Sequence, residues 1–155
     1  MKKKLFLLVL FIGISCFGQK DSLNDSLPKI NGPINDFANL LRLDQEIALK
    51  VSINNFSKKY EIGIIIVTVN SIEPYKNIYE YSLDLANQNS LGCVYMIICE
   101  DCREIQIQNC DAIVDKLTNE ETKQIITNSI VPMFKEEEYF QGIWNGVTEI
   151  MRELY

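Results

Sequence analysis

The segment Gly92–Cys110 most constrains the fold, because a fully apolar run is followed closely by an alternating one. Val94–Ile98 contains only apolar residues, which is typical of a strand that is buried on both faces. After a polar turn at Glu100–Asp101, isoleucines alternate with polar residues over Glu104–Gln108, which indicates a strand with one covered face. These two strands predict a β-hairpin around which the rest of the chain is organised.

A strand–helix–strand unit precedes and shares this hairpin. Gly63–Val69 is apolar and rich in β-branched residues, which predicts a buried strand. Tyr75–Asn87 follows with apolar residues at helical spacing, and the first strand of the hairpin comes next. A helix that connects two neighbouring strands makes them parallel, whereas the hairpin adds an antiparallel strand. The sequence therefore predicts a single α/β domain with a mixed central sheet.

Three further helices are indicated by periodicity and by capping residues. Asp44–Tyr60 carries one apolar stripe, with acidic residues at its start and lysines at its end, as the helix dipole prefers. Thr118 and Glu121 form the two halves of a capping box for a helix that follows the hairpin. Tyr139–Glu153 is the last predicted helix. Pro132 precedes it inside a helical pattern, which predicts a kink or break at that point.

The N-terminus has the pattern of a secretory signal peptide. Lys2–Lys4 provide a basic start, and Leu5–Ile14 form an apolar run that is too short to cross a bilayer and is followed by small residues. We predict cleavage near Gly18, so that residues 1–18 form the signal peptide, residues 19–32 a polar linker and residues 33–155 the domain. The predicted location is therefore periplasmic or secreted. A lipoprotein signal ending at Cys16 is the alternative, and only this alternative places the chain at a membrane.

Composition limits the partners and the chemistry. The chain has 155 residues, which suffice for one domain with a core of its own. Its net charge is −6, and removal of residues 1–18, which hold three lysines and no acid, leaves 12 basic and 21 acidic residues and a net charge of −9. Such a charge repels phosphate backbones, so nucleic acid is not an expected partner. The sequence contains no histidine, which excludes serine–histidine and cysteine–histidine mechanisms within this chain.

Four cysteines remain after cleavage: Cys93, Cys99, Cys102 and Cys110. In an oxidising compartment, disulfides are the expected state of such residues. With a turn at residues 100–101, Cys99 and Cys102 face each other across the turn, while Cys93 and Cys110 lie one step out of register at the open end. We predict the pairs 99–102 and 93–110. A redox pair at 99–102 and a four-cysteine zinc site are the alternatives, but redox motifs usually begin a helix and a hairpin keeps these thiols at two ends.

Three segments of the chain together resemble one family. They are Ile34–Leu41, then Glu61–Val69 with Ser71, then Ile130–Lys135 followed by Tyr139, Gly142 and Gly146. In this order and spacing they resemble the TPM domain, which occurs in exported bacterial proteins, in thylakoid lumen proteins linked to photosystem II repair and in animal acetylcholine-receptor modulators. The resemblance covers about residues 34–154 and implies a central sheet with helices on both faces.

The resemblance also implies a site, because some TPM proteins have been described as acid phosphatases and some bind divalent metal. The site is expected where the Asn35–Asp36 loop and the loops before and after the hairpin meet. This chain departs from the family pattern: its loop at residues 87–92 is short and lacks an acid, and Asn119 replaces a second one. Asp36 remains, with Asp111 and Asp115 as substitute ligands for calcium or magnesium. The competing interpretation is that Asp36 bonds to its own loop and the other two are solvated.

These features predict a non-catalytic binding or assembly module that contacts another envelope protein and needs no cofactor. The aromatic residues available for a partner surface are Tyr75, Tyr79, Tyr139, Phe140 and Trp144. Such residues more often pack inside a protein, and the periodic position of Trp144 favours packing. The alternative function is a weak acid phosphatase that depends on calcium or magnesium, with Asp36 as a metal ligand. A third alternative is a redox protein that cycles the cysteine pair of the hairpin turn.

Overall fold

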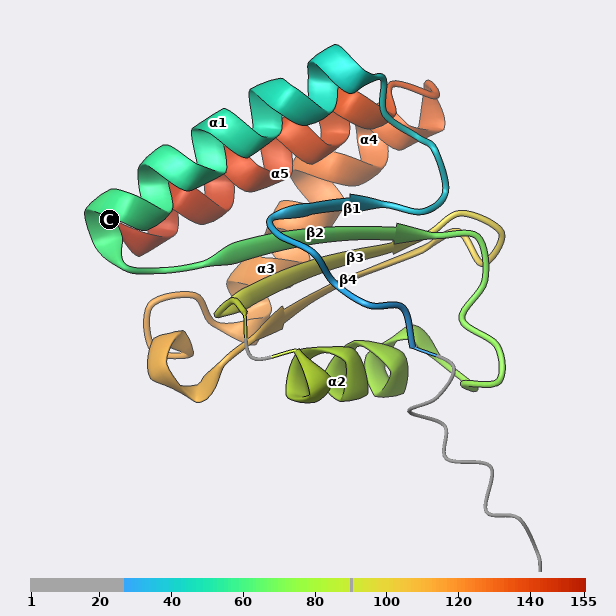
Figure 1. The fold of residues 1–155 in the computed structure, drawn as a ribbon, viewed down its shortest axis with the longest axis horizontal. Helices are drawn as coiled ribbons and strands as arrows, with labels where there is room; N and C mark the ends of the chain where they lie inside the picture. The colour runs from blue at the N-terminus through green and yellow to red at the C-terminus, as the bar shows by residue number, and fades with distance from the viewer. Residues whose placement is uncertain (1–26, 90) are drawn as a thin grey trace, which may run out of the picture.

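The computed structural model describes residues 27–89 and 91–155, so the predicted signal peptide and Cys16 lie outside the described residues (Figure 1). The strands are β1 (Ile34–Asp36), β2 (Ile64–Val69), β3 (Val94–Cys99) and β4 (Glu104–Asn109). The helices are α1 (Leu43–Tyr60), α2 (Ile78–Gln88), α3 (Asn119–Ile125), α4 (Val131–Lys135) and α5 (Tyr139–Leu154), with a 3₁₀ turn η2 (Asp111–Ile113) and a π-helical turn η3 (Ile126–Ile130). No helix in these two ranges is long and apolar enough to cross a membrane.

The four strands form one mixed sheet in the order β1-β2-β3-β4. Strands β1, β2 and β3 are parallel and β4 is antiparallel to β3, so the predicted α/β fold with a βαβ unit and a hairpin is confirmed. Helix α2 covers one face, and α1, α3, α4 and α5 cover the other (Figure 1). The sequence does not predict β1, because Asn35–Asp36 favours a turn; in the structure the turn follows, and Asp36 pairs with Thr68.

The two crossover connections between parallel strands have opposite hands. Helix α1 connects β1 to β2, and α2 connects β2 to β3, so both connections step one strand in the same direction across the sheet. Their helices nevertheless pack on opposite faces (Figure 1). One of the two therefore departs from the right-handed rule that governs almost all such connections.

Every residue of β2 and β3 is buried, and this burial creates two separate cores. Successive side chains of a strand point to opposite faces of the sheet. Ile66 and Met96 therefore join the core under α1 and α5, whereas Val67 and Ile97 join the core under α2. The uninterrupted apolar runs in the sequence are explained by this need to cover both faces.

The packed part of the chain begins before the predicted domain boundary at residue 33. Leu27 and Ile30 are buried in the core on the α2 side of the sheet, together with Tyr75 and Leu85. Together with the side chains of the short helix α2, these two side chains cover this face of the sheet. Residues 27–32 therefore contribute side chains to this core.

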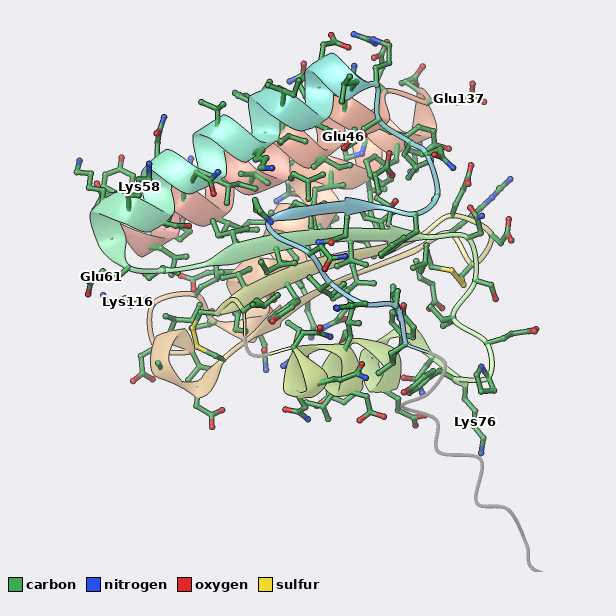
Figure 2. The ribbon with its side chains drawn as sticks, viewed as in Figure 1. Glu46, Lys58, Glu61, Lys76, Lys116 and Glu137 are labelled. Carbon is green, nitrogen blue, oxygen red and sulfur yellow. A yellow bond between two sulfur atoms is a disulfide. The ribbon has the colours of Figure 1, made fainter. Side chains whose placement is uncertain are left out.

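Both predicted disulfides are present, and they lie at opposite ends of the hairpin (Figure 2). The Cα atoms of Cys93 and Cys110 are 4.9 Å apart, and those of Cys99 and Cys102 are 5.3 Å apart. The predicted register is wrong by two residues: the prediction places Cys102 opposite Cys99, whereas Glu104 lies there, so that four residues rather than two form the turn. Cys93 consequently lies directly opposite Cys110. The four sulfur atoms do not converge as a zinc site requires.

Loss of the Cys93–Cys110 bond should cost more stability than loss of Cys99–Cys102. The bonds span sequence separations of 17 and 3 residues, and the loop-entropy relation gives about 3 and about 2 kcal/mol respectively. The test is urea unfolding of two variants, Cys93→Ala with Cys110→Ala and Cys99→Ala with Cys102→Ala, beside the oxidised parent. A larger loss for the turn bond would contradict this explanation.

The predicted break near Pro132 is confirmed, as a change of helix type. Helix α3 continues into the π-helical turn η3, which continues into α4 with Pro132 in its first turn. Proline is tolerated there because the amide hydrogen that it lacks is not needed for an ordinary α-helical bond. The wider π turn accommodates the local irregularity, so the helical segments follow one another without a loop.

Two glycines of α5 let the segment η3–α4 pack directly against this helix. A Cβ atom on Gly146 would lie 2.6 Å from Cδ1 of Ile130 and 2.9 Å from Cε of Met96. A Cβ atom on Gly142 would lie 2.6 Å from the ring of Phe134 and 3.1 Å from the carbonyl oxygen of Ile130. Ile130 and Met96 are fully buried, so neither side chain has free space to move into.

Gly146→Ala should destabilise the domain although alanine favours helix. The gain in helix propensity is about 1 kcal/mol, but overpacking of a filled core costs about 1–3 kcal/mol. We expect a net loss of about 1 kcal/mol in urea unfolding. Thr148→Ala, at an exposed position of the same helix, is the control and should leave stability unchanged or slightly higher. A stabilised Gly146→Ala variant would show that the contact is not tight.

Candidate functional site

The carboxylate of Asp36 is used to organise its own loop. Its Oδ1 accepts a hydrogen bond from the N–H of Leu40 (3.1 Å), and its Oδ2 accepts one from the N–H of Leu41 (2.8 Å). The hydroxyl of Thr68 donates to Oδ1 as well, which ties the loop to β2. Three bonds occupy most of the acceptor capacity of this carboxylate. Asp36 therefore fixes the connection from β1 to α1, as the competing interpretation of the sequence held.

Asp111 and Asp115 lie at the other end of the sheet. The strand register places Asp36 level with Ile105 of β4, whereas Asp111 and Asp115 follow the far end of β4 at Asn109. At about 3.3 Å per residue, the strand alone separates the two sets by roughly 13 Å. Ligands of one calcium ion lie about 2.3–2.6 Å from it, so these carboxylates cannot share an ion. No group of three or more Cys, Asp or Glu side chains within 27–89 and 91–155 is arranged to hold a metal.

Two of the three loops that the resemblance brings together do meet, at the end of the sheet away from Asp36. The N–H of Cys93 donates to the carbonyl of Gly63 (2.8 Å), and a disulfide links this end to the loop after β4. The hydroxyl of Tyr95 accepts hydrogen bonds from the N–H groups of Leu91 (3.2 Å) and Gly92 (3.3 Å). The short loop is thus closed by a tyrosine hydroxyl.

A groove of about 790 Å³ lies at the carboxyl end of β3 and beside the start of β4. The carboxyl ends of parallel strands are where open α/β sheets usually bind ligands. It runs between the hairpin turn and the corner that joins α4 to α5. Its lining residues are Ile98, Cys99, Glu100, Asp101, Arg103, Glu104, Ile105, Val131, Phe134, Lys135, Glu137 and Tyr139. We call this feature the hairpin groove. Figure 2 shows Glu137 at the same end of the molecule as the turn disulfide.

The hairpin groove combines an acidic rim with an aromatic wall. Four carboxylates and two cationic side chains line it, so the groove has a negative balance. Phe134 and Tyr139 stand edge to face, with ring centroids 5.1 Å apart, and both are half-buried. Such a combination of an apolar wall and charged rim is typical of a surface that takes an extended chain or a small polar ligand. The sequence does not predict it, because residues 136–138 look like a solvated turn.

Two residues of the hairpin groove hold left-handed backbone conformations. Arg103 has φ 54° and Glu137 has φ 59°, although neither is glycine. Such conformations cost about 1–2 kcal/mol for residues with a side chain. The N–H of Arg103 donates to the carbonyl of Glu100 (3.1 Å), and the N–H of Glu137 donates to the carbonyl of Phe134 (3.2 Å). Both turns therefore keep charged side chains at positions where glycine is favoured.

The aromatic residues considered for a partner surface divide between core and surface. Tyr75 is buried, and its hydroxyl donates to Asp84 (3.1 Å); burial and then this carboxylate raise the pKa of Tyr75 to about 12. Phe140 and Trp144 are half-buried and contact each other, with centroids 5.8 Å apart. Tyr79 on α2 is mostly exposed. Of the five, only Tyr139 lines the hairpin groove.

The fold and the groove define an α/β domain with a disulfide-linked hairpin beside its strand ends. The TPM domain family matches residues 34–153, and the chain belongs to this family. No curated protein matches the chain. A solved N-terminal domain of a protein from P. gingivalis is similar in fold, with a TM-score of 0.72 and 22% identity over 78% of this chain and 80% of that one. An N-terminal domain from Corynebacterium glutamicum has a TM-score of 0.57 and 12% identity over 84% of this chain and 85% of that one.

Asp36→Asn should lower stability equally with and without divalent metal. The variant loses the charge that strengthens three hydrogen bonds, which costs about 1–3 kcal/mol. Calcium or magnesium at about 1 mM should leave the melting temperature of the parent unchanged. At this concentration the fold gains about 2.7 kcal/mol of stability only from a site with a dissociation constant of about 10⁻⁵ M or lower, and carboxylates that cannot share an ion do not form such a site. Asp111→Asn is the control and should melt like the parent. A metal-dependent rise that Asp36→Asn abolishes would establish Asp36 as a ligand.

Proposed function

We propose that this chain is an exported TPM-domain binding module, and that the hairpin groove is the surface with which it contacts another envelope protein. The observation that carries the proposal is the position of the groove. It lies at the carboxyl end of β3, and its rim carries charged side chains that the core does not use. Both disulfides suit a protein that works in an oxidising compartment.

The chemistry of the groove indicates the class of partner. Glu100, Asp101, Glu104 and Glu137 outnumber Arg103 and Lys135 on its rim. A basic side chain of the partner gains from this balance, and an apolar side chain beside it gains from the wall formed by Phe134 and Tyr139. We therefore propose a polypeptide segment in which a lysine or arginine neighbours an apolar residue. No cofactor is part of this proposal.

A metal-dependent acid phosphatase remains the alternative function. Its support is membership of the TPM family, together with Asp36, the one expected acid that this chain keeps. Against it stands the use of that carboxylate by Leu40, Leu41 and Thr68. Hydrolysis of p-nitrophenyl phosphate with and without calcium or magnesium separates the two functions. Metal-dependent turnover that is lost in Asp36→Asn favours the phosphatase.

The binding function is tested by site-specific photocrosslinking in the native cell. A photoreactive phenylalanine analogue replaces Tyr139 in the hairpin groove or, as a matched control, Tyr79 on the exposed side of α2. We expect a discrete protein adduct from position 139 and none from position 79. Reversal of rim charge in Glu104→Lys with Glu137→Lys should reduce the adduct about tenfold, which corresponds to about 1.4 kcal/mol. Equal adducts from both positions, or none from position 139, would contradict the proposal.

A further inference from the structure

Helix α1 carries an apolar stripe on the side that faces away from the domain. Leu43, Ile47 and Val51 are spaced four residues apart, which places them on one face of the helix. They are 72%, 53% and 54% exposed. Leu49, Ile53 and Phe56 of the same helix already provide its buried face. The domain therefore has no use for the outer stripe, and three neighbouring exposed aliphatic side chains on one helix mark an interaction surface.

Charged side chains flank this stripe in a pattern that complements itself. Glu46 and Lys50 lie on the same flank of the stripe, one helical turn apart. Neither forms an ion pair within the part of the chain that the structure describes. When a two-fold axis relates two antiparallel helices, the same flank of each helix faces its counterpart. Glu46 of each helix then lies beside Lys50 of the other helix, so that two acid–base pairs form.

We propose that α1 is a homodimerisation surface, in which two copies of the helix pack antiparallel through Leu43, Ile47 and Val51. With the two-fold axis beside Ile47, each Leu43 contacts Val51 of the second copy, because both lie four residues from the axis. Ile47 contacts its own symmetry mate. Glu46 of one copy pairs with Lys50 of the second copy, and the reverse pair forms as well. The stripe shares no residue with the hairpin groove, so dimerisation and partner binding are independent.

The second copy fits this surface better than a membrane does. The flank that carries Glu46 and Lys50 is complemented by a surface on which an acid and a base have the same spacing. Another copy of α1 supplies such a surface. An anionic bilayer is repelled by the net charge of the chain, which is −6. The stripe is short, so the dimer is weak: a stable interface buries about 800 Å² per partner, and we expect a dissociation constant on the order of 10–100 µM.

Sedimentation velocity of the mature chain over about 5–500 µM spans this range and should show a monomer–dimer equilibrium. Ile47→Lys places a charge on the axis and should weaken the dimer at least tenfold. The control is Leu83→Lys, which changes an exposed aliphatic side chain on α2 (37% exposed) and should dimerise like the parent. Thermal melts confirm that both variants are folded. A parent that stays monomeric throughout, or an Ile47→Lys variant that dimerises normally, would overturn the proposal.

A charge exchange tests the antiparallel register. Glu46→Lys alone places lysine beside Lys50 of the second copy and should weaken the dimer. The double variant Glu46→Lys with Lys50→Glu restores opposite charges across the axis and should dimerise as the parent does. A second probe is Ile47→Cys, which should form an intermolecular disulfide on mild oxidation, whereas Leu83→Cys should not. If the double variant fails to recover, the two copies do not meet in this register and the proposal is wrong.

Discussion

The complete burial of β2 and β3 is the constraint on which the rest of the structure depends. All side chains of both strands are buried, so both faces of the sheet need a cover. Helices α1, α3, α4 and α5 cover one face, and α2 together with Leu27 and Ile30 covers the other. Since apolar burial contributes about 25 cal/mol per Å², two such cores supply most of the free energy that holds the fold. Strand β3 leads into the hairpin turn, which lies at the end of the sheet where the groove forms.

The second constraint involves Asp36, the residue that the family resemblance associates with a metal. The hydroxyl of Thr68 is fully buried, and a buried hydroxyl without a partner is costly. Asp36 accepts its hydrogen bond and also holds the backbone of the loop that leads into α1. The same carboxylate therefore connects three segments of the chain. Its structural role explains its presence in a chain that lacks the other expected acids.

Two surfaces are left over once these structural needs are met. The hairpin groove lies at one end of the sheet and is built from the turn and the α4–α5 corner, both shaped by residues in left-handed conformations. The outer stripe of α1 lies on the helical layer and is apolar with charged flanks. The outer stripe of α1 and the charged rim of the hairpin groove do not contribute to the core. The proposed binding function uses the groove, and the proposed dimer uses the stripe.

The sequence by itself determined the elements whose signals are local. The apolar run of β3, the capping box of Thr118 and Glu121, and the break at Pro132 depend on neighbouring residues, and the structure confirms each of them. Even a short-range signal can shift a boundary: α2 begins at Ile78 because the side chain of Asn77 accepts a hydrogen bond from Glu80, whereas apolar spacing alone places its start at Tyr75.

Only the tertiary structure decided β1, the hairpin register, and the separation of Asp36 from Asp111. These depend on which way each strand runs and how it is aligned with strands far away in the sequence, and contacts between distant segments set both.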